Sequence, residues 1–323
     1  MIIEKKYTVD TKSDIIFVKV DMKNYFKTQE YEFTDFLIFV LMELSTNLLK
    51  YGNGGYIWLI QQENKYSIAC FDNGKGIEDL DSALMSGYTT ADNSLGLGLY
   101  QIANNSNFDM QIFTKTKYKY SGTVVLVSQK DLNEEMVFFS KPYMELEQNG
   151  DYFVNKDRFF VFGDASGHGI KAQKSAIKIK KFFLDEFVSF SLTKDFFTSL
   201  HEYLKKNSQR STVIAVGEKN SNKVEISGIG NLNIWLQQSV GFTRKTFKDG
   251  IVGEVFENCT THSFELYKKQ KLILTTDGLV PRDTKEFLDE LKHNNSPLML
   301  SLCMLHFLSS ELDDNSILIF EEK

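Results

Sequence analysis

One stretch near the start of the chain constrains its fold more than any other. The seven apolar residues at 36–42 (FLIFVLM) predict the buried side of a helix, and Glu43 and Asn47 follow. Residues four apart share one face of a helix, so a carboxylate and an amide project together from its most hydrophobic part. This pattern is typical either of a functional face or of a solvated stripe.

Composition limits the classes of function. The 323 residues suffice for two domains, and 42% of them are hydrophobic and 25% charged, a globular profile. The net charge of −6 does not favour a nucleic-acid-binding surface. The apolar run is shorter than the roughly 20 residues of a membrane span, and the first ten residues lack a signal-peptide pattern. Three scattered cysteines without a CxxC motif are typical of a cytoplasmic protein.

The pattern of strands and helices predicts two domains of mixed α+β class. A strand-like run ends near residue 128 and an acidic, polar stretch follows it. We therefore expect a first domain at 1–130, a linker at 131–143 and a second domain at 144–323. The principal strands expected are 57–61, 66–71, 123–128, 159–162, 211–216, 223–226, 233–236, 272–275 and 317–320, with helices at 97–104, 171–190 and 284–293.

Three motifs in the first half are candidates for one nucleotide site. They are the Glu43–Asn47 pair, the DNGKG at 72–76 and the LGLGL at 95–99. The oxygen of Asn47 can bind Mg²⁺ beside substrate phosphates, and Asp72 at a strand end can accept a hydrogen bond from an exocyclic amine.

The glycines of these motifs suit a flat ring and a phosphate group. Gly74 and Gly76 have no Cβ, so a ring can lie against the backbone. Gly96 and Gly98 expose backbone N–H groups at a helix start, where phosphate is favoured. Each motif alone also fits an ordinary turn, and neither GxxxxGK[ST] nor GxGxxG is present. The order and spacing of all three favour a site.

In this order the motifs resemble the GHKL (Bergerat) ATP-binding fold, an α/β sandwich, over about residues 10–128. More narrowly, they are similar to the anti-sigma-factor serine kinases of bacterial partner switching. The resemblance implies Glu43 as general base, Asn47 as Mg²⁺ ligand, Asp72 as the reader of adenine, Gly74 and Gly76 in the adenine pocket, Gly96 and Gly98 in the phosphate lid, and Thr123 near adenine.

The lid departs from that family. The stretch 87–99 is short, and the first arginine of the chain is Arg158, so no arginine stands near the lid to hold a γ-phosphate. Lys50 or Lys75 can take its place. The departure leaves open whether this half transfers phosphate or only binds ATP.

Four aspartates mark strand ends in the second half, namely Asp151, Asp164, Asp277 and Asp314. Carboxylates at strand tips can converge at one edge of a sandwich, but their repulsion requires a cation. Oxygen ligands suit Mg²⁺ or Mn²⁺, and two such ions lower the pKa of a shared water and position it against phosphorus. Each aspartate alone also fits an ordinary turn, whereas GDASGHG is a rarer pattern.

Together, residues 148–323 resemble the PP2C-class serine/threonine phosphatases, in their compact SpoIIE-like branch with an αββα sandwich. The order GD, DxSGHG, TDG and DDxS carries this resemblance. We interpret His168, within the second motif, as a loop residue. The resemblance implies that Asp151, Asp164, the backbone carbonyl of Ala165, Asp277 and Asp314 bind metal, with Asp313 competing for the last place.

The two resemblances together predict a cytoplasmic, bifunctional regulator of signal transduction. An ATP- and Mg²⁺-dependent kinase would phosphorylate a serine or threonine of a STAS-domain anti-sigma-factor antagonist, and a Mn²⁺- or Mg²⁺-dependent phosphatase would remove that phosphate. A homodimer is possible for such kinases, and neither nucleic acid nor membrane is expected as a partner. The alternative is that the first half binds ATP without catalysis and regulates the attached phosphatase or a bound partner.

Overall fold

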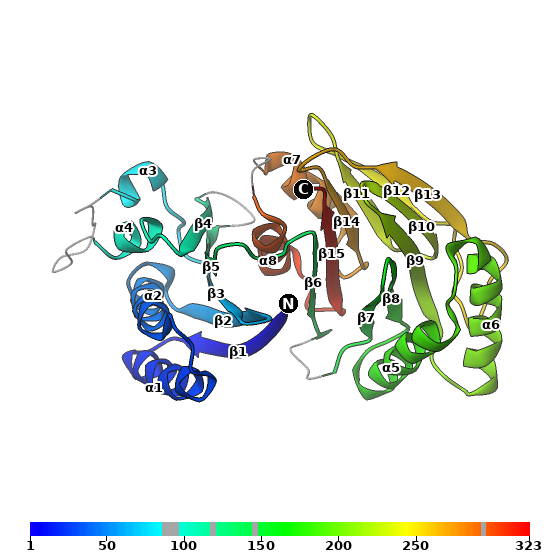
Figure 1. Cartoon of the computed structure of the whole chain (residues 1–323), viewed down its shortest axis with the longest axis horizontal. Coiled ribbons are helices and arrows are strands. Elements are labelled where there is room, and N and C mark those ends of the chain that lie inside the picture. Colours follow the sequence, from blue (N-terminus) through cyan, green and yellow to red (C-terminus); the bar gives the residue numbers. More distant parts are fainter. Residues whose placement is uncertain (86–96, 117–120, 144–147, 292–294) are drawn as a thin grey trace. The chain divides into compact units, whose positions relative to one another are not determined.

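The computed structural model describes residues 1–85, 97–116, 121–143, 148–291 and 295–323. It separates into two compact units, Met1–Asn133 and Glu134–Lys323, and we describe each by itself (Figure 1). In the described residues no helix is long and apolar enough to cross a membrane.

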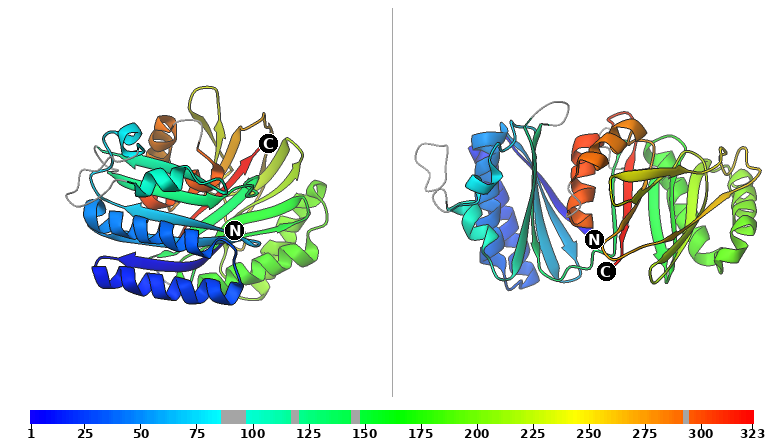
Figure 2. Two further views of the ribbon diagram at one scale, coloured as in Figure 1. Left: turned by 60° about the vertical axis from the view of Figure 1, so that its left-hand side comes forward. Right: turned by 90° about the horizontal axis from the view of Figure 1, so that it is seen from above.

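The N-terminal unit is a two-layer α/β sandwich. Its five-stranded antiparallel sheet has the order β1-β2-β3-β5-β4, and the long helices cover one face (Figure 2). The elements are β1 (Ile2–Val9), α1 (Lys12–Gln29), α2 (Thr34–Asn47), the π-helical turn η1 (Leu48–Gly52), β2 (Gly55–Gln62), β3 (Lys65–Asp72), α3 (Leu80–Ala83), α4 (Gly98–Ala103), β4 (Phe108–Lys115) and β5 (Gly122–Gln129).

Local sequence explains the two long helices of this unit. Thr11 and Asp14 form a capping box at the start of α1, in which each side chain accepts a hydrogen bond from the other's backbone N–H. In α2 the apolar run is buried against the sheet, while Glu43 and Asn47 stay partly exposed. The predicted helix with a polar pair on its open side is therefore observed.

The C-terminal unit has four layers, with two sheets packed face to face between two pairs of helices (Figure 2). Both sheets are five-stranded, with the orders β13-β10-β9-β8-β7 and β12-β11-β14-β15-β6. This is the αββα arrangement predicted for this half. The elements are β6 (Met136–Lys141), β7 (Asp151–Lys156), β8 (Phe159–Ala165), α5 (Gly169–Glu186), the 3-10 turn η4 (Phe190–Leu192), α6 (Thr193–Lys206), β9 (Thr212–Asn220), β10 (Lys223–Ile229), β11 (Asn233–Gln237), β12 (Phe242–Thr246), β13 (Thr260–Glu265), β14 (Lys271–Thr275), α7 (Pro281–Glu290), α8 (Pro297–Leu308) and β15 (Asn315–Glu321).

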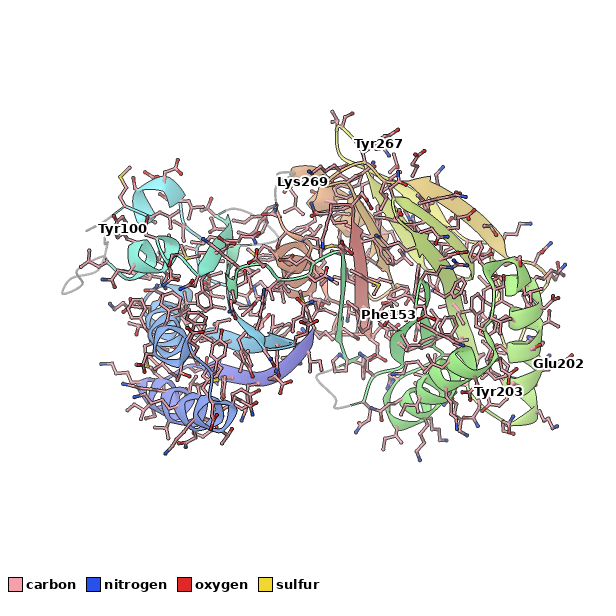
Figure 3. The ribbon with its side chains drawn as sticks, in the orientation of Figure 1. Tyr100, Phe153, Glu202, Tyr203, Tyr267 and Lys269 are labelled. Atoms are coloured by element: carbon pink, nitrogen blue, oxygen red, sulfur yellow. The ribbon has the colours of Figure 1, made fainter. Side chains whose placement is uncertain are left out.

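The segment predicted as a linker, 131–143, contains strand β6. Its residues pair antiparallel with β15 and form the edge of the second sheet. Phe138 of β6 stacks on Phe153 of β7 with ring centroids 5.1 Å apart, which ties the two sheets together (Figure 3 labels Phe153). The acidic composition of 129–135 hid this strand, because the apolar residues that define it begin only at Met136.

Helix α5 is shorter than the predicted 171–190 helix. It ends at Glu186, and Phe187 adopts an extended backbone conformation. The Lys156 side chain donates hydrogen bonds to the carbonyl oxygens of Leu184 at 2.7 Å and Phe187 at 3.2 Å, which satisfies acceptors at this helix end.

Candidate functional sites

Two aspartates of the C-terminal unit face each other across neighbouring strands. Asp151 opens β7 and Asp164 lies near the end of β8, and the two residues are direct partners in the antiparallel ladder. Asp151 is 7% exposed, although carboxylates are among the side chains least often buried. The sheet therefore brings together the first two aspartates that the sequence singled out.

Each of these carboxylates keeps one buried oxygen without a partner. Oδ1 of Asp151 and Oδ1 of Asp164 are buried and accept no hydrogen bond, while Oδ2 of Asp151 accepts one from Thr276 Oγ1 at 2.9 Å. Unpaired buried oxygens of this kind are costly in an apolar setting. A divalent cation, which prefers oxygen ligands, would satisfy both. The donor set therefore fits a metal ion.

The electrostatics of the pair lead to the same conclusion. Burial raises the pKa of the Asp151 carboxyl well above its usual range, and the neighbouring Asp164 charge raises it further. Burial also raises the pKa of Asp164 to about 8, and repulsion from Asp277, Asp313 and Asp314 adds to the effect. The cluster thus holds more negative charge than it can keep ionised without a cation.

Asp277 lies in the loop after β14 and contributes the largest of these repulsions on Asp164. Its Oδ2 accepts a hydrogen bond from Asn231 Nδ2 at 2.6 Å. Asn231 was not singled out from the sequence, where only its place before β11, in GNLN, hints at a loop near the strand ends.

The structure distinguishes the two candidates for the last acidic position. Both oxygens of Asp314, which is 1% exposed, accept backbone hydrogen bonds, from Tyr143 N at 2.6 Å and Gly150 N at 2.7 Å. Asp313 is more open. One of its oxygens accepts a hydrogen bond from the Asp314 N–H at 2.9 Å. Burial raises the pKa of Asp313, and repulsion from Asp277 adds to it. Asp313 is therefore the more accessible of the two and Asp314 the more firmly held, and each oxygen of Asp314 keeps a second lone pair for a cation. The predicted ligand role of Asp314, with Asp313 as its competitor, stays a prediction.

The loop that precedes β7 lies close to the end of β8. The Ala165 N–H donates to the Gly150 carbonyl oxygen at 3.2 Å. A Cβ added to Gly150 would come within 3.0 Å of the Ala165 carbonyl oxygen and 2.8 Å of Ala172 Cβ, so only glycine fits. His168 directly precedes α5 and stacks on Tyr143 at 4.2 Å, as expected of a loop residue.

The acidic side chains do not yet form a coordination shell. Across 1–85, 97–116, 121–143, 148–291 and 295–323, no three His, Cys, Asp or Glu side chains stand close enough to hold one ion. One oxygen of Asp277 accepts a hydrogen bond from Asn231, and the two oxygens of Asp314 accept from backbone N–H groups. The Asn231 contact engages only Oδ2 of Asp277 and leaves Oδ1 for a cation.

In the N-terminal unit, Glu43 meets the start of α4. A Cβ added to Gly98 would overlap the Glu43 carboxylate, which shows that this carboxylate lies directly against the start of α4. Asn47 ends α2 and leads into the π-helical turn η1, a feature that is often found at functional sites. The predicted Gly96 lies outside the described residues.

Asp72 ends β3 and lies opposite Thr123 of β5 in the ladder. Its Oδ1 accepts a hydrogen bond from Gly74 N at 2.8 Å, and burial raises the pKa of its carboxyl. Thr123 Oγ1 is 3.3 Å from Thr114 Oγ1. Gly76 has a φ of +72°, a left-handed conformation that favours glycine. Asp72, Gly74, Gly76 and Thr123 therefore lie around one end of the β3–β5 pair.

Comparison with known proteins assigns a class to the C-terminal unit. Residues 155–301 match the model of the family described as Stage II sporulation protein E (SpoIIE). Over these residues the C-terminal unit is similar to the SpoIIE family. The match lies wholly within Glu134–Lys323 and does not extend to the N-terminal unit. No curated protein matches the chain.

Solved structures similar to this chain include several phosphatases. RsbX in complex with magnesium is 18% identical, with 58% of this chain and 94% of that chain covered and a TM-score of 0.49. The S. agalactiae serine/threonine phosphatase is 12% identical, with coverage of 58% and 99% and a TM-score of 0.48. The catalytic domain of the phosphatase PstP in complex with 2 manganese ions is 12% identical, with coverage of 58% and 96% and a TM-score of 0.45.

Proposed function

We propose that the C-terminal unit hydrolyses phosphoserine or phosphothreonine on a partner protein with the help of Mn²⁺ or Mg²⁺. The observation that carries this proposal is the pair of buried, unpartnered oxygens on Asp151 and Asp164. The SpoIIE match over residues 155–301 supports the same reaction class.

The proposed ligands come from four different segments of the unit. They are the carboxylates of Asp151, Asp164, Asp277 and Asp313 and the backbone carbonyl of Ala165. Divalent ions bound here would supply Lewis acidity, which lowers the pKa of a water molecule and offsets phosphate charge.

Other side chains of the unit position these ligands. Thr276 donates a hydrogen bond to Asp151, and Asn231 donates one to Asp277. Asp314 braces the loop in front of β7 through the N–H groups of Tyr143 and Gly150.

The test of this activity is phosphate release from a phosphoserine peptide with and without Mn²⁺. We expect Asp164→Ala and Asp277→Ala to abolish the Mn²⁺-dependent release while the chain stays folded. Asp185→Ala, at an exposed carboxylate in the last turn of α5, is the matched control. Full activity in both cluster variants would end the assignment.

We further propose that the N-terminal unit binds ATP and Mg²⁺ and transfers the γ-phosphate to a serine or threonine of a STAS-domain partner. The contact of Glu43 with Gly98 supports this, because it sets a carboxylate at the start of a helix. In this proposal Glu43 would accept the proton of the attacking hydroxyl, and Asn47 would be a ligand of Mg²⁺, which would offset the charge of the phosphates. Asp72 would accept a hydrogen bond from the adenine amine.

The two opposed activities would make the chain a partner-switching regulator. Nucleotide occupancy of the N-terminal unit is a simple way to bias the balance between them. A homodimer through the kinase unit belongs to the same proposal.

A second candidate is an N-terminal unit that only binds ATP and regulates the phosphatase or a bound partner. It is favoured by the absence of any arginine before Arg158, since a cation usually stabilises the transferring phosphate. Labelled ATP and a STAS-domain substrate distinguish the two. Label transfer that Glu43→Ala and Asn47→Ala both remove identifies a kinase, whereas nucleotide binding without transfer identifies a binding module.

A further inference from the structure

Three exposed aliphatic side chains lie on the outer face of α5, opposite the face that packs on the sheet. Ile170, Ile177 and Leu184 are 55%, 54% and 40% exposed, and they recur every seven residues. At this spacing they form one line of roughly 21 Å along the helix, which we name the α5 ridge. The opposite face of α5 is buried against β7 and β8 through Ala172, Ala176, Ile179 and Phe183.

Four lysines border the α5 ridge. Lys174 and Lys181 lie four residues after Ile170 and Ile177 and so share their side of the helix, while the other two lie further round it. All four are exposed, and within the described part of the chain no ion pair joins any of them to a carboxylate. The lysines are Lys171, Lys174, Lys178 and Lys181. The α5 ridge is thus a positive, apolar strip over the span of these lysines, and the exposed Asp185 and Glu186 give its C-terminal end the opposite charge.

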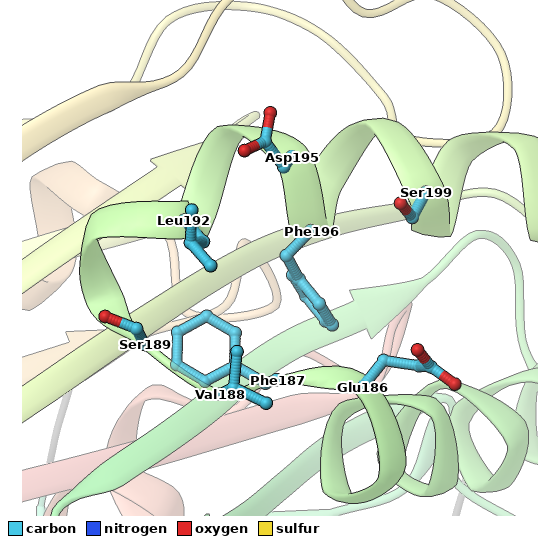
Figure 4. A pocket seen from close by; sticks show the side chains of 8 residues that line it. All are labelled: Glu186, Phe187, Val188, Ser189, Leu192, Asp195, Phe196 and Ser199. Atoms are coloured by element: carbon cyan, nitrogen blue, oxygen red, sulfur yellow. The ribbon is translucent and has the colours of Figure 1, made fainter.

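The strip continues past the end of α5 into a pocket between α5 and α6 (Figure 4). Phe187 and Phe196 line the pocket together with Val188 and Leu192, which are 68% and 46% exposed. The carboxylates of Glu186 and Asp195 also line it, so an uncharged, apolar end of the partner suits the pocket, while acidic residues suit the lysines along the ridge. A large apolar side chain of a partner can enter here. The apolar surface therefore extends beyond the helix itself.

We propose that the α5 ridge and this pocket bind an acidic amphipathic helix of a partner protein. A spacing of seven is the core spacing of paired helices, in which charges beside the core select the partner. Exposed lysines on one partner are matched by Glu or Asp on the other, and like charges at the same positions oppose pairing.

Two other occupants fit this surface less well. A second copy of α5 would set Lys174 and Lys181 against the same lysines, so charge opposes self-association. A lipid surface requires a continuous apolar face below the charged groups, whereas here the lysines alternate with the aliphatic side chains along the same side. An acidic helix, with its carboxylates placed between its own apolar side chains, suits both features.

The test uses the full chain and two synthetic helical peptides of about four heptads. Both peptides carry Leu at the core positions, and one has Glu and the other Lys at the flanking positions. Fluorescence anisotropy should show binding of the Glu peptide alone. Ile177→Asp should weaken it by about tenfold or more, and the double change Lys174→Glu with Lys181→Glu should transfer binding to the Lys peptide.

Val240→Asp is the matched control, because Val240 is an 88% exposed aliphatic residue away from α5. It should bind the Glu peptide as the unmodified chain does, and unchanged unfolding curves should show that each variant is folded. Equal binding of both peptides, no binding, or binding that Ile177→Asp leaves intact would each overturn the proposal. So would Ile177-dependent binding to phosphatidylserine vesicles, or an Ile177-dependent dimer in sedimentation. No readout requires kinase or phosphatase activity.

Discussion

Asp164→Asn should stabilise the metal-free chain at pH 8 while it removes phosphatase activity. The pKa of Asp164 is raised from 3.8 to about 8, by burial first and by neighbouring carboxylates second. A raised pKa means that the folded state binds the proton more tightly than the unfolded state does. The contribution of the Asp164 carboxyl to the free energy of unfolding is therefore fully present below about pH 4 and is lost as the pH rises towards 8.

The size of the effect follows from the difference between the ordinary pKa of 3.8 and the value of about 8 in the folded chain. This difference corresponds to roughly 5 kcal/mol of unfolding free energy as an upper limit. Asparagine has nearly the same shape and carries no charge at any pH. Its amide can also donate to the carboxylate of Asp151, its direct partner in the antiparallel ladder. We therefore expect a gain of a few kcal/mol at pH 8 and little change near pH 4.

Urea unfolding in EDTA at pH 5 and pH 8 measures this directly. The unmodified chain should lose stability between the two values, and Asp164→Asn should lose clearly less. Added Mn²⁺ should restore the stability of the unmodified chain at pH 8 and leave the stability of Asp164→Asn unchanged. A ligand of the folded state stabilises only a chain that binds it. Parallel pH profiles for the two proteins would refute the reasoning.

Three further predictions separate ligand, brace and nucleotide roles. Asp313→Asn should lower Mn²⁺-dependent hydrolysis at least tenfold, the scale of about 1.4 kcal/mol, without destabilising the metal-free chain, and unchanged turnover would exclude it as a ligand. Asp314→Ala should instead lower the free energy of unfolding by about 2–4 kcal/mol in urea curves, because it leaves the N–H groups of Gly150 and Tyr143 without acceptors. An unshifted unfolding curve would show that Asp314 does not stabilise this loop. Asp72→Asn should weaken ATP binding in calorimetry by about tenfold and leave phosphopeptide hydrolysis intact, and undiminished binding would remove Asp72 from the site.

Several features of the fold follow from local sequence. The apolar run before Glu43 predicts a helix with one buried side. Helix α2 has this form because packing its apolar side against the sheet removes that side from water. The runs before Asp164 and Asp277 predict strands that end in carboxylates, and β8 and β14 supply them. In each case hydrophobic burial decides the structure within a short window.

The details of the acidic cluster depend on partners far along the chain and could not be predicted. Sequence cannot tell Asp313 from Asp314, because the difference lies in which carboxylate meets the N–H groups of Tyr143 and Gly150, more than 160 residues away. The Asn231 contact with Asp277 is of the same kind. Strand β6 was also missed, since its position is set by pairing with β15 at the other end of the unit.

The measurement that tests the account most directly is anomalous X-ray scattering from Mn²⁺-soaked crystals at the manganese edge. We expect two peaks in contact with the carboxylates of Asp151, Asp164, Asp277 and Asp313, and none after Asp164→Ala. Manganese located elsewhere, or a cluster that stays empty while the soaked chain hydrolyses phosphoserine, would contradict the account.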